Sequence, residues 1–160
     1  MRFDRALTAF RSAVKYDPRN AGYLRNLGEI LSASSSFREA ESAFTQAIAL
    51  EPAHAETNYN LAIVKVALGA PREAITYGKA AVDASPSTAR YHYQLGLASE
   101  KSGDTDAAMR SYSVAIQHDS SYLLPMVNLG KLYDDGGRYD DALAVLVKAS
   151  QISAEDFAVN

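Results

Sequence analysis

Residues 21–54, AGYLRNLGEILSASSSFREAESAFTQAIALEPAH, decide the fold, because the rest of the chain repeats their pattern every 34 positions. The Leu27-Gly28 step aligns with Leu61-Ala62, Leu95-Gly96 and Leu129-Gly130. Alanine keeps the same step at positions 40, 74, 108 and 142. Self-similarity at a fixed period in this range is the signature of an array of stacked supersecondary units. The sequence therefore predicts a repeat protein rather than one ordinary globular domain.

Each period divides into two helices separated by turn residues. In the first full period we expect one helix from Asn20 or Ala21 to about Ala33, and a second from about Phe37 to Leu50. Proline cannot continue a helix and pushes the preceding residue out of the helical region, so a proline at position 52 ends the second helix. In the later periods, glycines at positions 69, 103 and 136–137 mark the break between the two helices.

The second helix of the first period carries one apolar stripe. Its members recur at intervals of three and four residues and are Phe37, Ala40, Phe44, Ala47 and Ile48. The alanines stay small because a paired helix passes closely, and a larger group would overpack the contact by about 1–3 kcal/mol. Helices of about 13 residues are marginal alone in water. We therefore expect the stability to come from stacking on neighbouring helices.

These residues resemble the tetratricopeptide repeat (TPR) family, whose unit is a helix-turn-helix of 34 residues. The first period fits the family pattern with Leu27, Gly28, Phe37, Ala40, Phe44, Ala47 and Pro52, in that order. The later periods depart from it at some positions. Gly78 stands where Phe44 does, Ser120 and Ala154 stand where Pro52 does, and the family's Trp is missing throughout. The resemblance covers residues 3–152.

The resemblance implies an all-α fold, a right-handed TPR superhelix (α-solenoid) of antiparallel helix pairs. We expect a single array over residues 1–160, with an N-terminal half repeat at 3–18 and four full repeats at 21–54, 55–88, 89–122 and 123–156. Phe3, Leu7, Phe10 and Val14 of the half repeat would then lie partly open. Open apolar surface of this kind marks interaction sites. We therefore expect either a fragment of a longer protein or an array that buries its ends against another copy.

The first helices of TPR arrays line the concave side, so the resemblance places the candidate peptide-binding residues there. The residue before each Leu of the Leu-Gly step is an amide: Asn26, Asn60, Gln94 and Asn128. An amide offers a donor and an acceptor, which suits the backbone of an extended peptide. Around this row, the expected apolar floor is Tyr59, Ile63, Val66, Tyr93, Leu97 and Val127, and the expected cations are Arg25, Arg90 and Lys131. In the alternative interpretation these side chains brace neighbouring helices.

A clamp for a chaperone tail is a weaker interpretation of the same helices. Co-chaperone TPR domains hold the C-terminal acid of heat-shock chaperones in a two-carboxylate clamp, and Arg25, Asn60 and Arg90 would fit it. However, Glu29 stands where a second amide is expected, and Gln94 stands where a cation is expected. A carboxylate in the clamp opposes the charge of the ligand.

Composition and motifs give little support to catalysis, metal binding or nucleic-acid binding. Sixteen basic and nineteen acidic side chains give a net charge of −3, which predicts no phosphate-backbone footprint. Cysteine is absent, so there is no thiolate metal site. We expect His54, His92 and His118 to be held apart, so that no nucleophile, base and orienting group converge. The acidic run at 134–141 lacks the alternating pattern of an EF-hand loop, and no apolar stretch approaches the roughly 18 residues of a membrane span.

We therefore predict a protein–protein interaction scaffold, not an enzyme, with no cofactor and no metal. It would bind an extended or short helical segment of a partner in the concave groove. Two alternatives stay open. The chain could be a structural module that self-assembles through its exposed ends, or a recruitment domain of a larger enzyme or complex.

Overall fold

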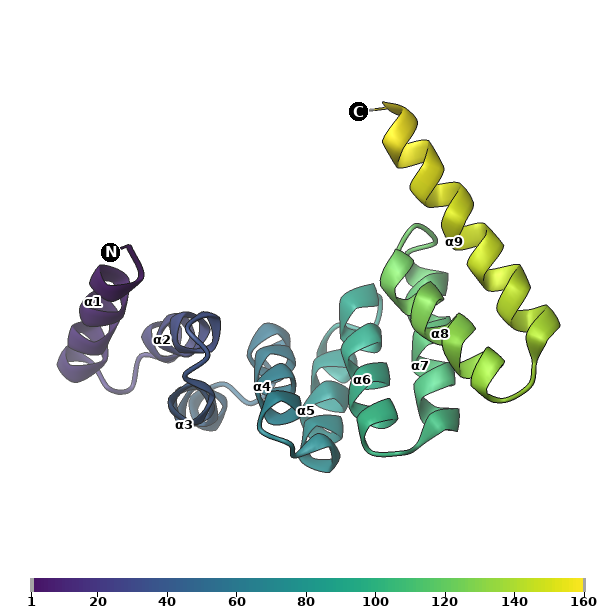
Figure 1. The fold of residues 1–160 in the computed structure, drawn as a ribbon. Coiled ribbons are helices and arrows are strands. Elements are labelled where there is room, and N and C mark those ends of the chain that lie inside the picture. The colour runs from purple at the N-terminus through teal and green to yellow at the C-terminus, as the bar shows by residue number, and fades with distance from the viewer. Residues whose placement is uncertain (1, 160) are drawn as a thin grey trace. The chain divides into compact units, whose positions relative to one another are not determined.

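The structure is a computed structural model that describes the backbone of residues 2–159 and the side chains of residues 5–154. The described backbone is helical, with short turns and no strand (Figure 1). The helices are α1 (Arg2–Tyr16), α2 (Ala21–Ala33), α3 (Phe37–Leu50), α4 (Ala55–Ala67), α5 (Pro71–Ala84), α6 (Ala89–Lys101), α7 (Thr105–His118), α8 (Leu123–Asp135) and α9 (Tyr139–Val159). The predicted all-α fold class is confirmed, and α2 and α3 have the predicted bounds.

The helices form two compact units, unit 1 over Met1–Pro86 and unit 2 over Ser87–Asn160. In unit 1, each of α1 to α4 packs against the next helix in the chain, and α2 also contacts α4. In unit 2, α6 to α9 pack in the same consecutive order. Short turns join the helices of each unit, so neighbouring helices form hairpins. The pairs α2–α3, α4–α5, α6–α7 and α8–α9 correspond to the four predicted helix pairs.

The turn inside each helix pair contains one residue in the left-handed backbone region. This residue is Gly69 (φ 76°), Gly103 (φ 86°) or Gly137 (φ 73°), and in the first pair it is Ser35 (φ 61°). Glycine has no Cβ and adopts this conformation without the steric cost that other residues meet. A Cβ added at any of the three glycines would meet no atom within 4 Å, so the backbone conformation alone favours glycine there. Ser35 is therefore the strained member of the set.

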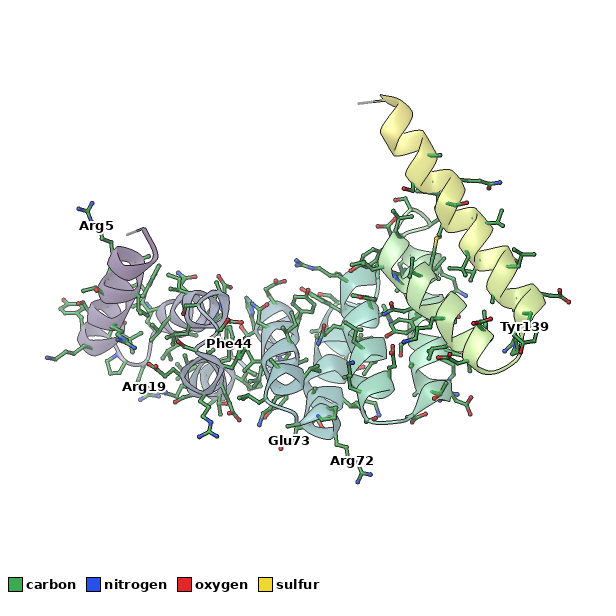
Figure 2. All side chains as sticks on the ribbon, viewed as in Figure 1. Arg5, Arg19, Phe44, Arg72, Glu73 and Tyr139 are labelled. Atoms are coloured by element: carbon green, nitrogen blue, oxygen red, sulfur yellow. The ribbon has the colours of Figure 1, made fainter. Side chains whose placement is uncertain are left out.

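The core of unit 1 is built around Phe44 of α3, which is fully buried (Figure 2). Its ring occupies the space beside a glycine of α2, because a Cβ at Gly28 would lie 2.6 Å from Phe44 Cε1. The buried residues around the ring are Leu31, Ala40, Ala43, Leu61 and Val64, and Phe37 and Ile48 are partly buried against them. The predicted apolar stripe of α3 is thus part of the core.

Unit 2 repeats this interlocking of a large side chain with a glycine. A Cβ at Gly96 of α6 would lie 2.5 Å from Cε1 of the buried Tyr112 of α7. In the next pair, a Cβ at Gly130 of α8 would lie 2.6 Å from Cγ of Leu146 of α9.

The pair α4–α5 has no large side chain at this position. Ala62 on α4 stands where the other first helices have glycine, and Gly78 on α5 stands where the other second helices have Phe44, Tyr112 or Leu146. Both residues are buried. Because Gly78 places no side chain beside α4, there is room for the methyl group of Ala62 at this position.

A buried cation joins three helices of unit 1. Lys65 of α4 is 8% exposed, and its Nζ lies 2.6 Å from Glu41 Oε1 of α3 and 2.5 Å from Glu73 Oε2 of α5. The hydrogen bond to Glu41, followed by the one to Glu73, raises the pKa of Lys65 to about 12. Lys65 is therefore charged at neutral pH, and its two partners provide the pairing that a buried charge requires.

Helix α9 departs from the other second helices in length. It has 21 residues, whereas α3, α5 and α7 have 14 each. Pro52 and Pro86 follow α3 and α5, but Ala154 stands at the equivalent position in α9 and does not interrupt the helix. Residue 156, the expected end of the last full repeat, lies within this helix.

Helix α1 corresponds to the predicted half repeat. Leu7 packs against the core of unit 1, and Phe10 and Val14 are partly buried, while the side chain of Phe3 lies outside the described residues. Within the described part of the chain, no helix is long and apolar enough to cross a membrane.

Candidate peptide-binding surface

The candidate residues lie on the first helices of the pairs, as the sequence predicts. In unit 1, α2 carries Arg25 and Asn26, and α4 carries Tyr59, Asn60 and Ile63. In unit 2, α6 carries Arg90, Tyr93, Gln94 and Leu97, and α8 carries Val127, Asn128 and Lys131. Each unit therefore has its own candidate surface, and their contacts differ.

In unit 1, two of the candidate polar residues are held by carboxylates. Arg25 donates to Glu51 Oε2 at 2.5 Å, and Asn60 Nδ2 donates to Glu29 Oε1 at 3.4 Å. A ligand carboxylate at either group would meet a like charge already in place. These contacts weigh against the chaperone-tail clamp, which requires both groups to receive the acid of the ligand.

In unit 2, three tyrosine rings lie together beside the candidate surface. The centroid of the Tyr93 ring of α6 lies 5.7 Å from that of Tyr112 and 5.3 Å from that of Tyr122, which precedes α8. Tilted rings at these separations attract one another in addition to burying area. Tyr93 therefore supports the position of α8 as well as offering part of its ring to the surface.

A chain of hydrogen bonds links the first helices of unit 2 through Tyr112. Asn128 Nδ2 of α8 donates to Tyr112 Oη at 3.2 Å, and Tyr112 Oη donates to Glu100 Oε2 of α6 at 2.6 Å. Burial, and then the hydrogen bond to Glu100, raise the pKa of Tyr112 above its usual range. The phenol consequently stays protonated and acts as a fixed donor. Sequence reasoning missed Tyr112 and its hydrogen bond to Glu100, because the bonded positions are far apart in the repeat.

The four amide side chains of the predicted row differ in their exposure to solvent. Asn26 is exposed, and Asn60 and Asn128 are partly exposed. Gln94 is only 6% exposed, so its amide has little surface to offer a ligand. The four residues do not form a ladder of equally available groups, and Asn128 is the amide of unit 2 that a peptide could reach.

Helix α8 presents the most open apolar surface among the candidate residues. Val127 is 49% exposed, and Leu124, which sequence reasoning missed, is also exposed. Leu124, Val127, Asn128 and Lys131 follow the spacing i, i+3, i+4, i+7 and therefore share one face of the helix. We call these four residues the α8 patch. Leu124 could have been found from this spacing, since it lies one turn before Val127.

The expectation that the histidines are held apart is wrong for one pair. The rings of His92 on α6 and His118 at the end of α7 are stacked, with centroids 5.2 Å apart and an interplanar angle of 25°. The two residues belong to the same predicted repeat, 89–122, and the antiparallel pairing of α6 and α7 brings the start of one helix beside the end of the other.

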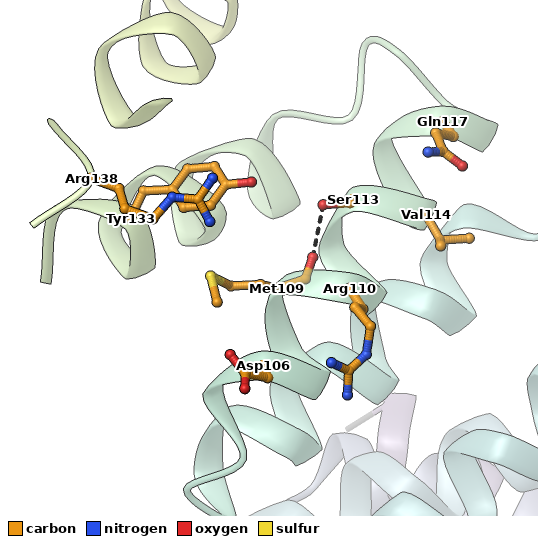
Figure 3. A pocket seen from close by; sticks show the side chains of 8 residues that line it. All are labelled: Asp106, Met109, Arg110, Ser113, Val114, Gln117, Tyr133 and Arg138. Carbon is orange, nitrogen blue, oxygen red and sulfur yellow. Dashed lines mark hydrogen bonds between the residues drawn. The ribbon is translucent and has the colours of Figure 1, made fainter. Parts of the chain in front are cut away.

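A shallow cavity of about 460 Å³ opens elsewhere on unit 2, and Figure 3 shows its lining. The lining residues are Asp106, Met109, Arg110, Ser113, Val114, Gln117, Tyr133 and Arg138. The guanidinium of Arg138 lies over the Tyr133 ring, 4.3 Å from its centroid, and also pairs with Asp141 at 2.6 Å. None of the candidate peptide-binding residues lines this cavity.

Comparisons with known families identify the class of protein. Four family profiles, each described as Tetratricopeptide repeat, match residues 2–34, 31–96, 89–120 and 126–156. The chain therefore belongs to the tetratricopeptide repeat family, as its sequence pattern predicts.

Solved structures show the same fold. The crystal structure of a protein named MamA aligns with a TM-score of 0.94 and 24% identity, over 98% of this chain and 91% of that chain. YrrB, described as a TPR protein with an unusual peptide-binding site, aligns with a TM-score of 0.82 and 24% identity, over 94% and 78%. A thermophilic TPR protein of Thermus thermophilus aligns with a TM-score of 0.75 and 27% identity, over 98% and 86%.

A comparison with curated proteins finds no match. TPR proteins are generally scaffolds without catalytic activity of their own. The family and the fold together support a protein–protein interaction scaffold, and they imply protein partners.

Proposed function

We propose that the chain binds a peptide segment of a protein partner on the first helices of unit 2, with the α8 patch at the centre of the contact. The observation that carries this proposal is the exposure of Leu124 and Val127 on the face of α8 that also holds Asn128 and Lys131. Exposed aliphatic groups beside polar ones are typical of partner sites, where apolar area gives affinity and polar groups fix orientation.

The polar members of the patch have separate roles in this proposal. An amide has two donor hydrogens and an acceptor oxygen, so the bond to Tyr112 leaves Asn128 able to pair with the main chain of a peptide. That bond also holds the amide in one orientation, which lowers the entropy cost of binding. Lys131 would pair with an acidic group of the ligand, and the partly buried Tyr93 and Leu97 of α6 would extend the apolar contact.

In this proposal, unit 1 contributes less peptide-contact surface than unit 2 does. Asn26 is exposed, and Tyr59 and Ile63 are partly exposed. Arg25 and Asn60 are already bound to Glu51 and Glu29, so we assign them a supporting role.

The proposal is tested by partner capture from an extract of the source cells, with quantitative mass spectrometry. The test variant is Leu124→Glu with Val127→Glu, because both side chains are exposed and their replacement leaves the core intact. Each lost aliphatic burial weakens binding by about 1.5–3 kcal/mol, so partners bound by the wild type should be strongly depleted. The matched control is Tyr16→Glu, which places a carboxylate at an exposed apolar residue of α1. Equal capture by the double variant and the wild type would refute the proposal.

A further inference from the structure

Three hydrogen-bonded side chains join three helices of unit 2. Helix α7 packs against both α6 and α8 (Figure 1). Glu100 Oε2 of α6 accepts from Tyr112 Oη of α7 at 2.6 Å, and Tyr112 Oη accepts from Asn128 Nδ2 of α8 at 3.2 Å. We call Glu100, Tyr112 and Asn128 the unit 2 network. Because Asn128 belongs to the α8 patch, the network connects that surface to a carboxylate on another helix.

The carboxylate fixes the direction of both bonds. A carboxylate has acceptor oxygens and no hydrogen to give, so the hydrogen between Glu100 and Tyr112 is the hydroxyl hydrogen of Tyr112. Burial favours this protonated form, since it raises the pKa of Tyr112 above its usual range. A hydroxyl has one hydrogen only, so Tyr112 Oη can only accept from Asn128. Asn128 must consequently turn its nitrogen, and not its oxygen, toward Tyr112.

The oxygen of Asn128 is the end of the amide that stays available to a ligand. Nδ2 is bonded to Tyr112, whereas Oδ1 accepts no hydrogen bond from the described residues. Every buried polar side-chain atom of the described residues has a partner, so Oδ1, which has none, is open to solvent. The α8 patch therefore presents a hydrogen-bond acceptor at this point.

The network occurs in one repeat of the chain. The position of Tyr112 is taken in the other repeats by residues without a hydroxyl group, Phe44, Gly78 and Leu146. The position of Glu100 is taken by Ser32, Val66 and Asp134. Glu100 also lies in the last turn of α6, where the helix dipole disfavours a negative charge. The repeat pattern and helix stability therefore do not account for this carboxylate, which leaves its bond to Tyr112.

We propose that Glu100 is a specificity-determining residue, which acts through Tyr112 to make Asn128 an acceptor for a backbone N–H of the bound peptide. This inference rests on the proposed function, because it concerns the peptide site at the α8 patch. Glu100 is a positioning residue in this arrangement. An amide that is free to turn over pairs with a backbone N–H or with a backbone C=O, whereas the fixed amide of Asn128 meets a C=O with its own oxygen. Two acceptors that face each other stay unsatisfied, so the site selects the N–H.

The test uses a defined peptide and the whole chain. A linear peptide is selected from a random phage-displayed library on the wild type, and peptides that still bind Leu124→Glu with Val127→Glu are discarded. The remaining probe binds at the α8 patch. Each backbone amide of the probe is then replaced in turn by an ester, which removes one N–H, and calorimetry measures each dissociation constant. We expect one ester to weaken binding to the wild type by about 3- to 10-fold, as the loss of one hydrogen bond does.

Variants of the network show whether Glu100 sets this preference. In Asn128→Leu the acceptor is gone, so this ester should bind as well as the parent peptide. In Glu100→Gln the new amide can donate to Tyr112 Oη, which frees the hydroxyl hydrogen for Asn128 Oδ1 and lets the Asn128 amide turn over. The effect of the ester should then shrink to about twofold or less. Tyr112→Phe keeps the ring in the core, removes the hydroxyl and should reduce the effect in the same way.

The matched control is Asp106→Asn, which removes an exposed carboxylate of unit 2 outside the network and should leave the effect of the ester unchanged. Circular dichroism should show that all variants keep the helix content of the wild type.

Two results would overturn this inference while the proposed function stands. The first is that no ester weakens binding to the wild type more than binding to Asn128→Leu, because the peptide then gives Asn128 no N–H. The second is an equal effect of the ester on the wild type, Glu100→Gln and Tyr112→Phe, because the network then has a structural role only. If the library yields no peptide whose binding depends on Leu124 and Val127, the proposed function fails, and this inference fails with it.

Discussion

Gly96→Ala tests the interlocking of helices α6 and α7 in unit 2. The new Cβ would lie 2.5 Å from Cε1 and 2.6 Å from Cδ1 of Tyr112. The ring has no room to move away, because it is buried and its hydroxyl bonds both Glu100 and Asn128. Overpacking of this kind costs about 1–3 kcal/mol. Alanine inside a helix is favoured over glycine by about 1 kcal/mol, so the net expected loss is about 1 kcal/mol.

The sign of this effect should depend on the residue at position 112. In a Tyr112→Ala background the obstacle is absent, and Gly96→Ala should stabilise the chain by about 1 kcal/mol through helix propensity alone. Residues in contact show such non-additivity in double-mutant cycles. The chain itself contains a related arrangement in α4–α5, where Ala62 accompanies Gly78.

Urea unfolding followed by circular dichroism measures the four free energies of the cycle, and hydrogen exchange of α6 and α7 shows that the change lies in unit 2. The matched control places Gly96→Ala in a Leu146→Ala background, where Tyr112 is intact and the substitution should still destabilise. The reasoning fails if Gly96→Ala has the same sign with Tyr112 and with Ala at position 112.

Two further predictions concern stability. Ser35→Gly removes left-handed strain of about 1–2 kcal/mol and adds chain entropy to the unfolded state worth about 0.4–1 kcal/mol, so stability should rise by about 0.5–1 kcal/mol. Thermal denaturation should show a higher midpoint for this variant and a lower one for Gly103→Ala, and an unchanged or lower midpoint for Ser35→Gly would contradict the assigned strain. Lys65→Met removes two charge-assisted bonds and should cost about 1–3 kcal/mol. The pKa of Lys65 is raised from 10.5 to about 12, so its contribution is fully present below pH 10.5 and is lost as pH rises through about 12. Urea titrations should therefore show a constant difference between wild type and variant from about pH 6 to pH 9, and a difference that shrinks within that range would contradict the pairing.

The sequence predicted the backbone well because the repeat supplies the same local signals several times. The bounds of α2 and α3 follow from the three serines at positions 34–36 and from Pro52, each of which acts on its immediate neighbours. The left-handed turns at Gly69, Gly103 and Gly137 follow from the one residue type that adopts them freely. Helix α9 is longer than the other second helices, and Ala154 stands where a proline follows α3 and α5.

The candidate site was less predictable, because burial depends on partners that a periodic pattern does not specify. Gln94 and Asn128 occupy the same position of the repeat, but Gln94 is buried whereas Asn128 stays partly open and bonds to Tyr112. The stacking of His92 on His118 likewise depends on how α6 and α7 align as an antiparallel pair. Spacing along one helix finds the members of a face, such as Leu124, but it does not show which face a neighbouring helix covers.

Site-specific photo-crosslinking tests the central claim, that a partner segment binds at the α8 patch. A photoreactive amino acid is placed at Val127 in one variant and at Val114, which lines the separate cavity of unit 2, in another. The account predicts crosslinks to a partner peptide from position 127 and few or none from position 114. Crosslinks from position 114 with none from position 127 would contradict it.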